Sequence, residues 1–165
     1  MCYLKFFIHA ICSIGVLERH HTSSRLQLRV NNMNISLDRL DEAHAALLSE
    51  TKALIELASH TLMNYLQDQN LQTLESLPNQ IREIAGAMLF LNAENGQAAL
   101  STTADFIQSR IESATALSAD DVNRVLDPLA SADMLIDNLK SKQPVLQSMF
   151  KVALDSSEKL KTVAP

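Results

Sequence analysis

Residues 82 to 86 have the spacing of a phosphoryl-accepting helix but lack the groups that would perform the reaction. Such a helix carries an exposed histidine as nucleophile, then an apolar residue, a lysine that balances phosphoryl charge, and a glycine that leaves room for a docking partner. Ile84 and Gly86 keep two of these places, whereas Arg82 and Ala85 stand in the histidine and lysine places. A guanidinium stays protonated and has no accessible lone pair. We therefore expect the geometry of a docking helix without the reaction.

Two histidines fall within the part of the sequence that has a helical pattern. His60 begins a similar run, but Met63 and Asn64 stand where a lysine and a glycine would be needed. We expect His60 to be an ordinary histidine on a helix surface, and the same for His44, which follows two acidic residues. An active phosphocarrier that uses His60 stays open as an alternative. It would require an exposed imidazole beside a basic residue.

Other kinds of chemistry find no support in the residues. The three glycines, at positions 15, 86 and 96, cannot form a phosphate-binding loop, and no serine lies in a strand-to-helix elbow. Both cysteines, Cys2 and Cys12, lie near the N-terminus, so they form no metal-ligand cluster with histidines in the body of the chain. We expect no catalytic residue, no cofactor and no metal site, and hence no enzyme.

The composition favours one helical domain. A chain of 165 residues with 47% hydrophobic residues, 4% aromatic residues and only three glycines suits helices better than turn-rich sheets. The net charge of −5 and the few basic residues after position 30 provide no basic face for nucleic acid. Cysteines confined to the N-terminus exclude a disulfide framework in the body and suit a reducing compartment.

Apolar residues recur at three- and four-residue steps from residue 37 to residue 160, which predicts successive amphipathic helices. Ser36 is expected to cap a long first helix, with a possible break near residues 49–51. A second main helix is expected over residues 81–91, after Pro78. The expected fold class is therefore an all-α antiparallel helical bundle.

Turn residues and prolines predict where the later helices begin. The run Asn-Ala-Glu-Asn-Gly at 92–96 predicts a tight turn before the third helix. Ser118, followed closely by two aspartates, predicts the cap of the fourth helix. Pro128 predicts a kink or a fresh helix start at Asp127, since an interior proline costs about 3 kcal/mol. Pro144 predicts the first turn of the last helix.

The same spacing predicts the core and raises a question about one glycine. Gly86 lies inside a helical pattern, where glycine costs roughly 1 kcal/mol relative to alanine. It therefore indicates close packing within the bundle, a notch that faces a partner, or both. The positions expected to be buried are Leu54, Leu57, Ile84, Leu91, Leu100, Phe106, Ile107 and Leu135.

Residues 1–34 are expected to be a poorly ordered or artefactual extension, and residues 35–163 the bundle. The apolar stretch 6–16 follows Lys5, but it is too short to span a bilayer, contains His9 and lacks a small-x-small cleavage site. A signal peptide or anchor, which would make the protein a membrane-tethered helical sensor module, stays open as a further alternative.

The segments 77–91 and 95–100 resemble the histidine-phosphotransfer-like domains of the type IV pilus chemosensory hybrid kinase ChpA and of the scaffold FimL. Those domains share a helix with a glycine followed by apolar residues, a short turn, and a following amphipathic helix. The resemblance covers residues 37–160 in helix order and is most specific over residues 81–100. It implies an antiparallel bundle of the histidine-phosphotransfer type with additional helices.

The resemblance also implies a role. It points to a cytoplasmic bacterial domain that acts as a scaffold or docking element in two-component, chemosensory signalling for type IV pili and twitching motility. The implied partners are signalling proteins such as response-regulator receivers or pilus-regulatory proteins, with no nucleic acid and no small-molecule substrate. The docking face is expected at Arg82, Glu83, Ala85 and Gly86. The oligomeric state, and whether the chain is a fragment of a larger hybrid kinase, stay open.

Overall fold

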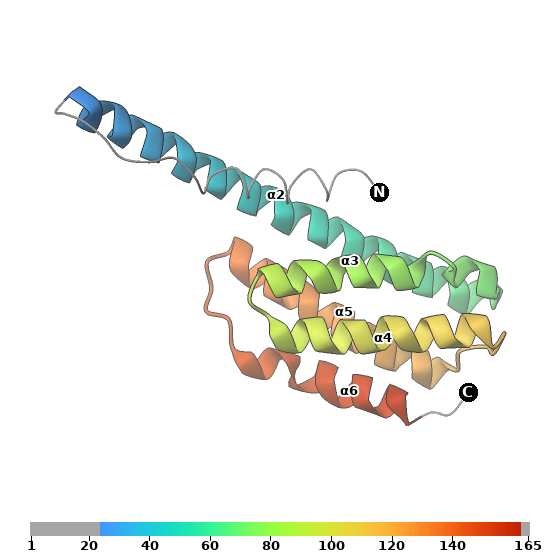
Figure 1. Cartoon of the computed structure of the whole chain (residues 1–165). Helices are drawn as coiled ribbons and strands as arrows, with labels where there is room; N and C mark the ends of the chain where they lie inside the picture. Colours follow the sequence, from blue (N-terminus) through green and yellow to red (C-terminus); the bar gives the residue numbers. More distant parts are fainter. Residues whose placement is uncertain (1–23, 163–165) are drawn as a thin grey trace. The chain divides into compact units, whose positions relative to one another are not determined.

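The computed structural model describes residues 24–162, and over this range the chain is built from helices with no strand. Figure 1 shows their order, with α3 to α6 running alternately up and down the bundle. The all-α antiparallel bundle expected from the sequence is confirmed. The elements are α2 (Ser24–Asp68), the 3₁₀ turn η1 (Leu71–Leu74), α3 (Leu77–Phe90), α4 (Glu94–Glu112), α5 (Ala119–Lys140), the 3₁₀ turn η2 (Gln147–Phe150) and α6 (Lys151–Lys161).

Residue 41, within α2, divides the chain into two units, and the helices from α3 onward belong to the second unit, Glu42–Pro165. Helix α2 begins at Ser24, so the cap predicted at Ser36 is wrong, and residues 24–34 belong to this helix. The predicted break at 49–51 is also wrong. Thr51 instead donates its hydroxyl to the carbonyl of Leu47 at 2.7 Å, a bond made within a continuing helix. The expectations for residues 1–23 lie outside the described residues.

The turn between α3 and α4 is shorter than predicted. Asn92 takes the left-handed conformation, with φ of 58°, and the N–H of Ala93 donates to the carbonyl of Met88 at 2.8 Å. Helix α4 then starts at Glu94, so Gly96 lies in its first turn and has a negative φ. Asn92 therefore adopts the left-handed conformation that forms the turn, which the sequence had placed over the whole run 92–96.

The start of α5 agrees with the prediction and its interior does not. The N–H of Asp121 donates to Ser118 Oγ, and Asp121 Oδ2 accepts from the N–H of Ser118, both at 3.1 Å, which forms a capping box. Helix α5 then continues unbroken past Pro128, so the predicted fresh start at Asp127 is wrong. Pro128 is buried, and Ser156 on α6 donates to the Asp127 carboxylate, so packing and this hydrogen bond offset the lost backbone bond.

The last helix starts later than predicted. Pro144 lies in the loop after α5, and α6 begins only at Lys151, after η2. Val145 and Leu146, which follow Pro144, are 42% and 62% exposed. Phe150, at the end of η2, belongs to the core and is 3% exposed.

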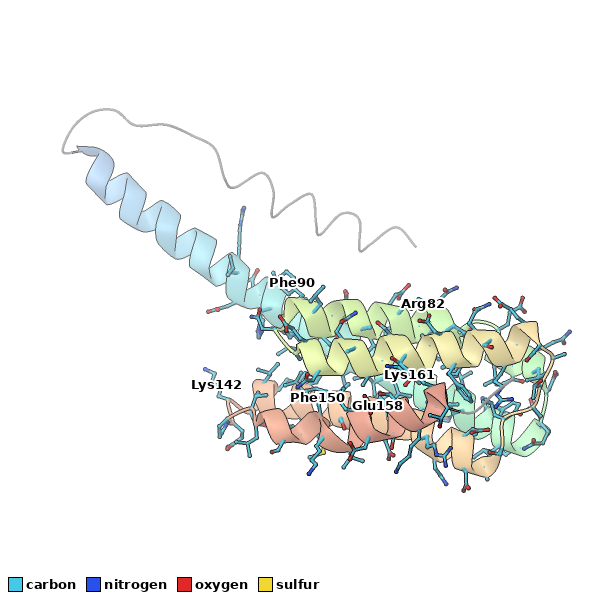
Figure 2. All side chains as sticks on the ribbon, turned by 60° about the horizontal axis from the view of Figure 1, so that its bottom comes forward. Arg82, Phe90, Lys142, Phe150, Glu158 and Lys161 are labelled. Atoms are coloured by element: carbon cyan, nitrogen blue, oxygen red, sulfur yellow. The ribbon has the colours of Figure 1, made fainter. Side chains whose placement is uncertain are left out.

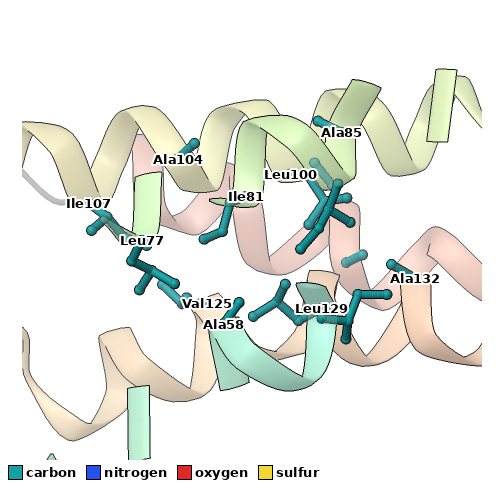
Figure 3. Packing of buried hydrophobic residues seen from close by; sticks show 14 of the residues in the cluster. Ala58, Leu77, Ile81, Ala85, Leu100, Ala104, Ile107, Val125, Leu129 and Ala132 are labelled. Atoms are coloured by element: carbon teal, nitrogen blue, oxygen red, sulfur yellow. The ribbon is translucent and has the colours of Figure 1, made fainter. Parts of the chain in front are cut away.

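The core lies between the helices, and Figure 3 shows its apolar side chains meeting there. Five predicted core positions are confirmed as buried: Ile84, Leu100, Phe106, Ile107 and Leu135. Leu54 and Leu91 are partly buried and pack against the core. Leu57 is 50% exposed, so its prediction is wrong. The buried stripe of α2 instead runs through Leu48, Ile55, Ala58, Leu62 and Tyr65.

Candidate docking surface

Arg82 lies on the exposed side of α3 and is tied to the neighbouring helix. Its Nη2 is 3.0 Å from Oδ1 of Asp105 on α4, and the two side chains are 42% and 74% exposed. Its Nη1 lies 3.5 Å from Oδ1 of Asn79, one turn earlier on α3. The guanidinium is therefore held at the edge between α3 and α4 but stays accessible to solvent.

Gly86 lies one helical turn after Arg82 and is also exposed. A Cβ added to it would meet no heavy atom within 4 Å, apart from the helix's own backbone and chain neighbours, so close packing does not explain this glycine. Its φ is not positive either, so no special backbone conformation requires it. The interpretation as close packing within the bundle is wrong, and the glycine leaves a shallow open place on the outer face of α3.

Ala85 does not belong to this surface. It is 3% exposed and packs in the core with Ile81 and Leu100, as Figure 3 shows. The expected docking face included Ala85, and that part of the expectation is wrong. The reason is the helical period, because residue 85 lies next to Ile81 and Ile84 on the buried stripe of α3. Glu83 is exposed, as expected.

The sequence interpretation missed three residues of this region. Leu89 and Phe90, which end α3, are 57% and 59% exposed, and they follow Gly86 at the three- and four-residue steps that share a helix face. Figure 2 shows Phe90 and Arg82 on the same helix. The third residue is Asp105, the partner of Arg82. The sequence did carry a signal for Leu89 and Phe90. Residues 88–91 are four successive apolar residues, and these cannot all lie on the side of one helix that faces the core.

We refer to the exposed residues of this helix as the α3 face: Arg82, Glu83, Gly86, Leu89 and Phe90. It combines the cation of Arg82 with an open place at Gly86 and the exposed apolar side chains of Leu89 and Phe90. The acceptor of the cation is Asp105, which a competing carboxylate can replace. The face has no histidine, cysteine or serine to act as a nucleophile.

His60 occupies a different setting. Its side chain is exposed and lines a groove between α2 and α5, together with Glu56 and Asp133. None of the residues that line this groove is a lysine or an arginine. The basic neighbour that a phosphocarrier would require is therefore missing from the lining. His44, the other histidine of the helical part, is exposed on α2.

Neither a membrane-spanning helix nor a cluster of metal-ligating side chains occurs in the part of the chain that the structure describes. Between residues 24 and 162, no helix has both the length and the apolar character that crossing a membrane requires. Over the same range, no three side chains of His, Cys, Asp or Glu come together in a way that could hold a metal ion.

Comparison with known proteins identifies the family. Searches of curated proteins and of solved structures found no match. A family model described as the FimL C-terminal domain matches residues 38–157, which is more than half of the chain and includes the whole α3 face. The chain therefore belongs to the FimL C-terminal domain family.

Proposed function

We propose that this domain is a non-enzymatic docking module in the chemosensory signalling that controls type IV pili and twitching motility, located in the bacterial cytoplasm. It binds signalling proteins through the α3 face and transfers no phosphoryl group. Membership of the FimL C-terminal domain family supports the pilus context. The exposed, chemically unreactive α3 face supports the docking role.

The observation that carries the proposal is the open place at Gly86. A glycine inside a helix costs about 1 kcal/mol, and here neither packing nor backbone conformation requires it. What the glycine provides is space between Arg82 and the exposed pair Leu89 and Phe90. Space bordered by a cation and apolar side chains suits the insertion of a partner's side chains or backbone.

The state of Arg82 is compatible with binding. Exposed ion pairs contribute only about 0–1 kcal/mol, so a carboxylate from a partner can replace Asp105 at little cost. Arginine can then bind that carboxylate through two parallel hydrogen bonds. A partner with an acidic pocket beside an apolar surface, such as the receiver domain of a response regulator, fits these requirements.

A binding titration with a receiver domain from such a pilus chemosensory system tests the docking role. Arg82→Gln removes the cation and Gly86→Leu fills the open place, and both should weaken binding about tenfold or more. Matched controls are Lys159→Gln and Ala98→Leu, which make the same kinds of change at exposed positions on α6 and α4. Affinity that is the same in all four variants and the native chain would place the interface elsewhere.

A second experiment tests the absence of phosphotransfer. Incubation with a kinase and labelled ATP, or with a phosphorylated receiver, should leave no acid-labile phosphohistidine on this chain. If label appears and His60→Gln removes it, the protein is a phosphocarrier and the docking proposal fails in its present form.

A further inference from the structure

An open groove between α2 and α5 has features of a second binding surface. It has a volume of about 370 Å³ and shares no residue with the α3 face. Ile55 and Met63 line it from α2, and Ala130 lines it from α5. Met63 is 49% exposed, and Met134, one turn after Ala130, is 57% exposed. Flexible methionines at an exposed groove adapt to the shape of an apolar ligand.

Carboxylates lie along this apolar groove. Glu56 and Asp133 line it directly, and Asp137 lies one turn after Asp133 on α5. The ammonium group of Lys52 is shared between Asp133 and Asp137, at N–O distances of 2.9 and 2.8 Å. Glu56 takes part in no ion pair with any side chain that the structure describes. Three carboxylates face one ammonium, so the surroundings of the groove carry a net negative charge.

We propose that the α2/α5 groove binds a cationic amphipathic helix of a partner protein. The apolar face of that helix would cover Ile55, Met63 and Ala130, while its lysines or arginines would lie against Glu56 and Asp133. A groove between two packed helices suits an amphipathic helix, whose apolar residues repeat every three or four positions. The carboxylates select the charge, because an acidic helix would be repelled and a neutral one would leave Glu56 without a partner.

The probe is a synthetic helical peptide of leucine and lysine, with leucines at three- and four-residue steps, titrated against the full chain by fluorescence anisotropy. Two comparison peptides have the same leucine positions with glutamate in place of lysine, or the same leucines and lysines in scrambled order. The amphipathic lysine peptide should bind at least about tenfold more tightly than either. Raising the salt concentration should weaken its binding, since exposed charge pairs are screened.

Variants of the protein locate the binding. Glu56→Lys reverses the charge at the groove, and Ala130→Phe fills the groove from an exposed position, so each should weaken binding about tenfold. Glu50→Lys is the matched control, because it makes the same charge change on the same helix at an exposed residue outside the lining. It should leave the affinity within about twofold, as should Arg82→Gln on the α3 face.

Three results would overturn the proposal. The first is equal binding of the scrambled and amphipathic lysine peptides, which would show attraction to charge alone. The second is unchanged affinity in both Glu56→Lys and Ala130→Phe. The third is equal weakening by Glu50→Lys and Glu56→Lys. Thermal melts of every variant check that each is folded. Loss of binding in Arg82→Gln alone would assign the peptide to the α3 face instead.

Discussion

The ring of Phe150, the last residue of η2, packs directly against the backbone of Gly96 in the first turn of α4. A Cβ on residue 96 would lie 2.6 Å from Cε1 and 2.8 Å from Cζ of that ring. Phe150 is 3% exposed, and Gly96 is buried and does not have a positive φ. Gly96 is therefore required by the close approach of two helices rather than by a turn.

Gly96→Ala should lower the free energy of unfolding by about 1–3 kcal/mol. The added methyl group forces the buried ring to move, and this overpacking outweighs the gain of roughly 1 kcal/mol in helix propensity. Urea denaturation measures the change. Phe150→Leu should relieve the clash, so the double variant should lose less stability than the two single variants combined. Strict additivity would contradict the proposed contact.

Gly86→Ala should have the opposite effect and raise the free energy of unfolding by about 0.5–1 kcal/mol. The methyl group enters open space, and alanine restricts the unfolded chain more than glycine does. The same urea experiment compares the two glycines directly. A loss of stability in Gly86→Ala would mean that this glycine is packed after all.

The contrast between these glycines shows what the sequence can and cannot determine. Both lie within helices, whereas the sequence placed Gly96 in a turn and left Gly86 undecided. The residue that requires a glycine at position 96 is Phe150. Because Phe150 lies far along the chain, no local sequence pattern could reveal this contact. Ser118 was predictable because its partner Asp121 is three residues away and the capping box is a local structure.

The candidate site follows the same rule. The exposure of Arg82 and Gly86 follows from their one-turn spacing, and the helical period would also have excluded Ala85 had it been applied strictly. The pairing of Arg82 with Asp105 depends on the register of α3 against α4, which core packing sets. Continuation of α5 through Pro128 likewise depends on tertiary packing, which outweighs the local cost of proline.

Tyr65→Phe should lower the free energy of unfolding by about 1–3 kcal/mol. Tyr65 is fully buried, and its hydroxyl oxygen accepts the N–H of Leu117 at 2.8 Å, in the loop before α5. Removing the hydroxyl leaves a buried N–H without an acceptor, which is the costly case for a hydrogen bond. Urea denaturation measures this loss of stability. A cost for Tyr65→Phe below about 0.5 kcal/mol would indicate that water replaces the hydroxyl.

Asp105→Asn should separate stability from binding at the α3 face. Loss of an exposed ion pair should change the free energy of unfolding by less than about 1 kcal/mol. If the proposed docking role is correct, the freed guanidinium should bind an acidic receiver a few-fold more tightly. Asp155→Asn, an exposed change of equal charge on α6, is the control for net charge. Weaker receiver binding in Asp105→Asn alone would mean that Asp105 itself contacts the partner.

The last prediction concerns Lys52, which joins α2 to α5. Hydrogen bonds to the carboxylates of Asp137 and Asp133 raise the pKa of Lys52 above its ordinary value of 10.5. A raised folded-state pKa means that the stabilisation is fully present below the unfolded-state pKa and is lost as the pH rises through the folded-state pKa. The native chain should therefore lose this contribution only at strongly alkaline pH.

Lys52→Arg provides the comparison, because a guanidinium keeps its charge to a pH above about 12. As the pH rises above about 10.5, the free energy of unfolding of the native chain should fall more steeply than that of Lys52→Arg, as measured by urea denaturation at each pH. Other groups that titrate in this range are common to both proteins, so the difference isolates residue 52. Parallel pH profiles would show that the ammonium contributes equally in the folded and unfolded states, and that the Lys52 ion pairs do not stabilise the contact between α2 and α5.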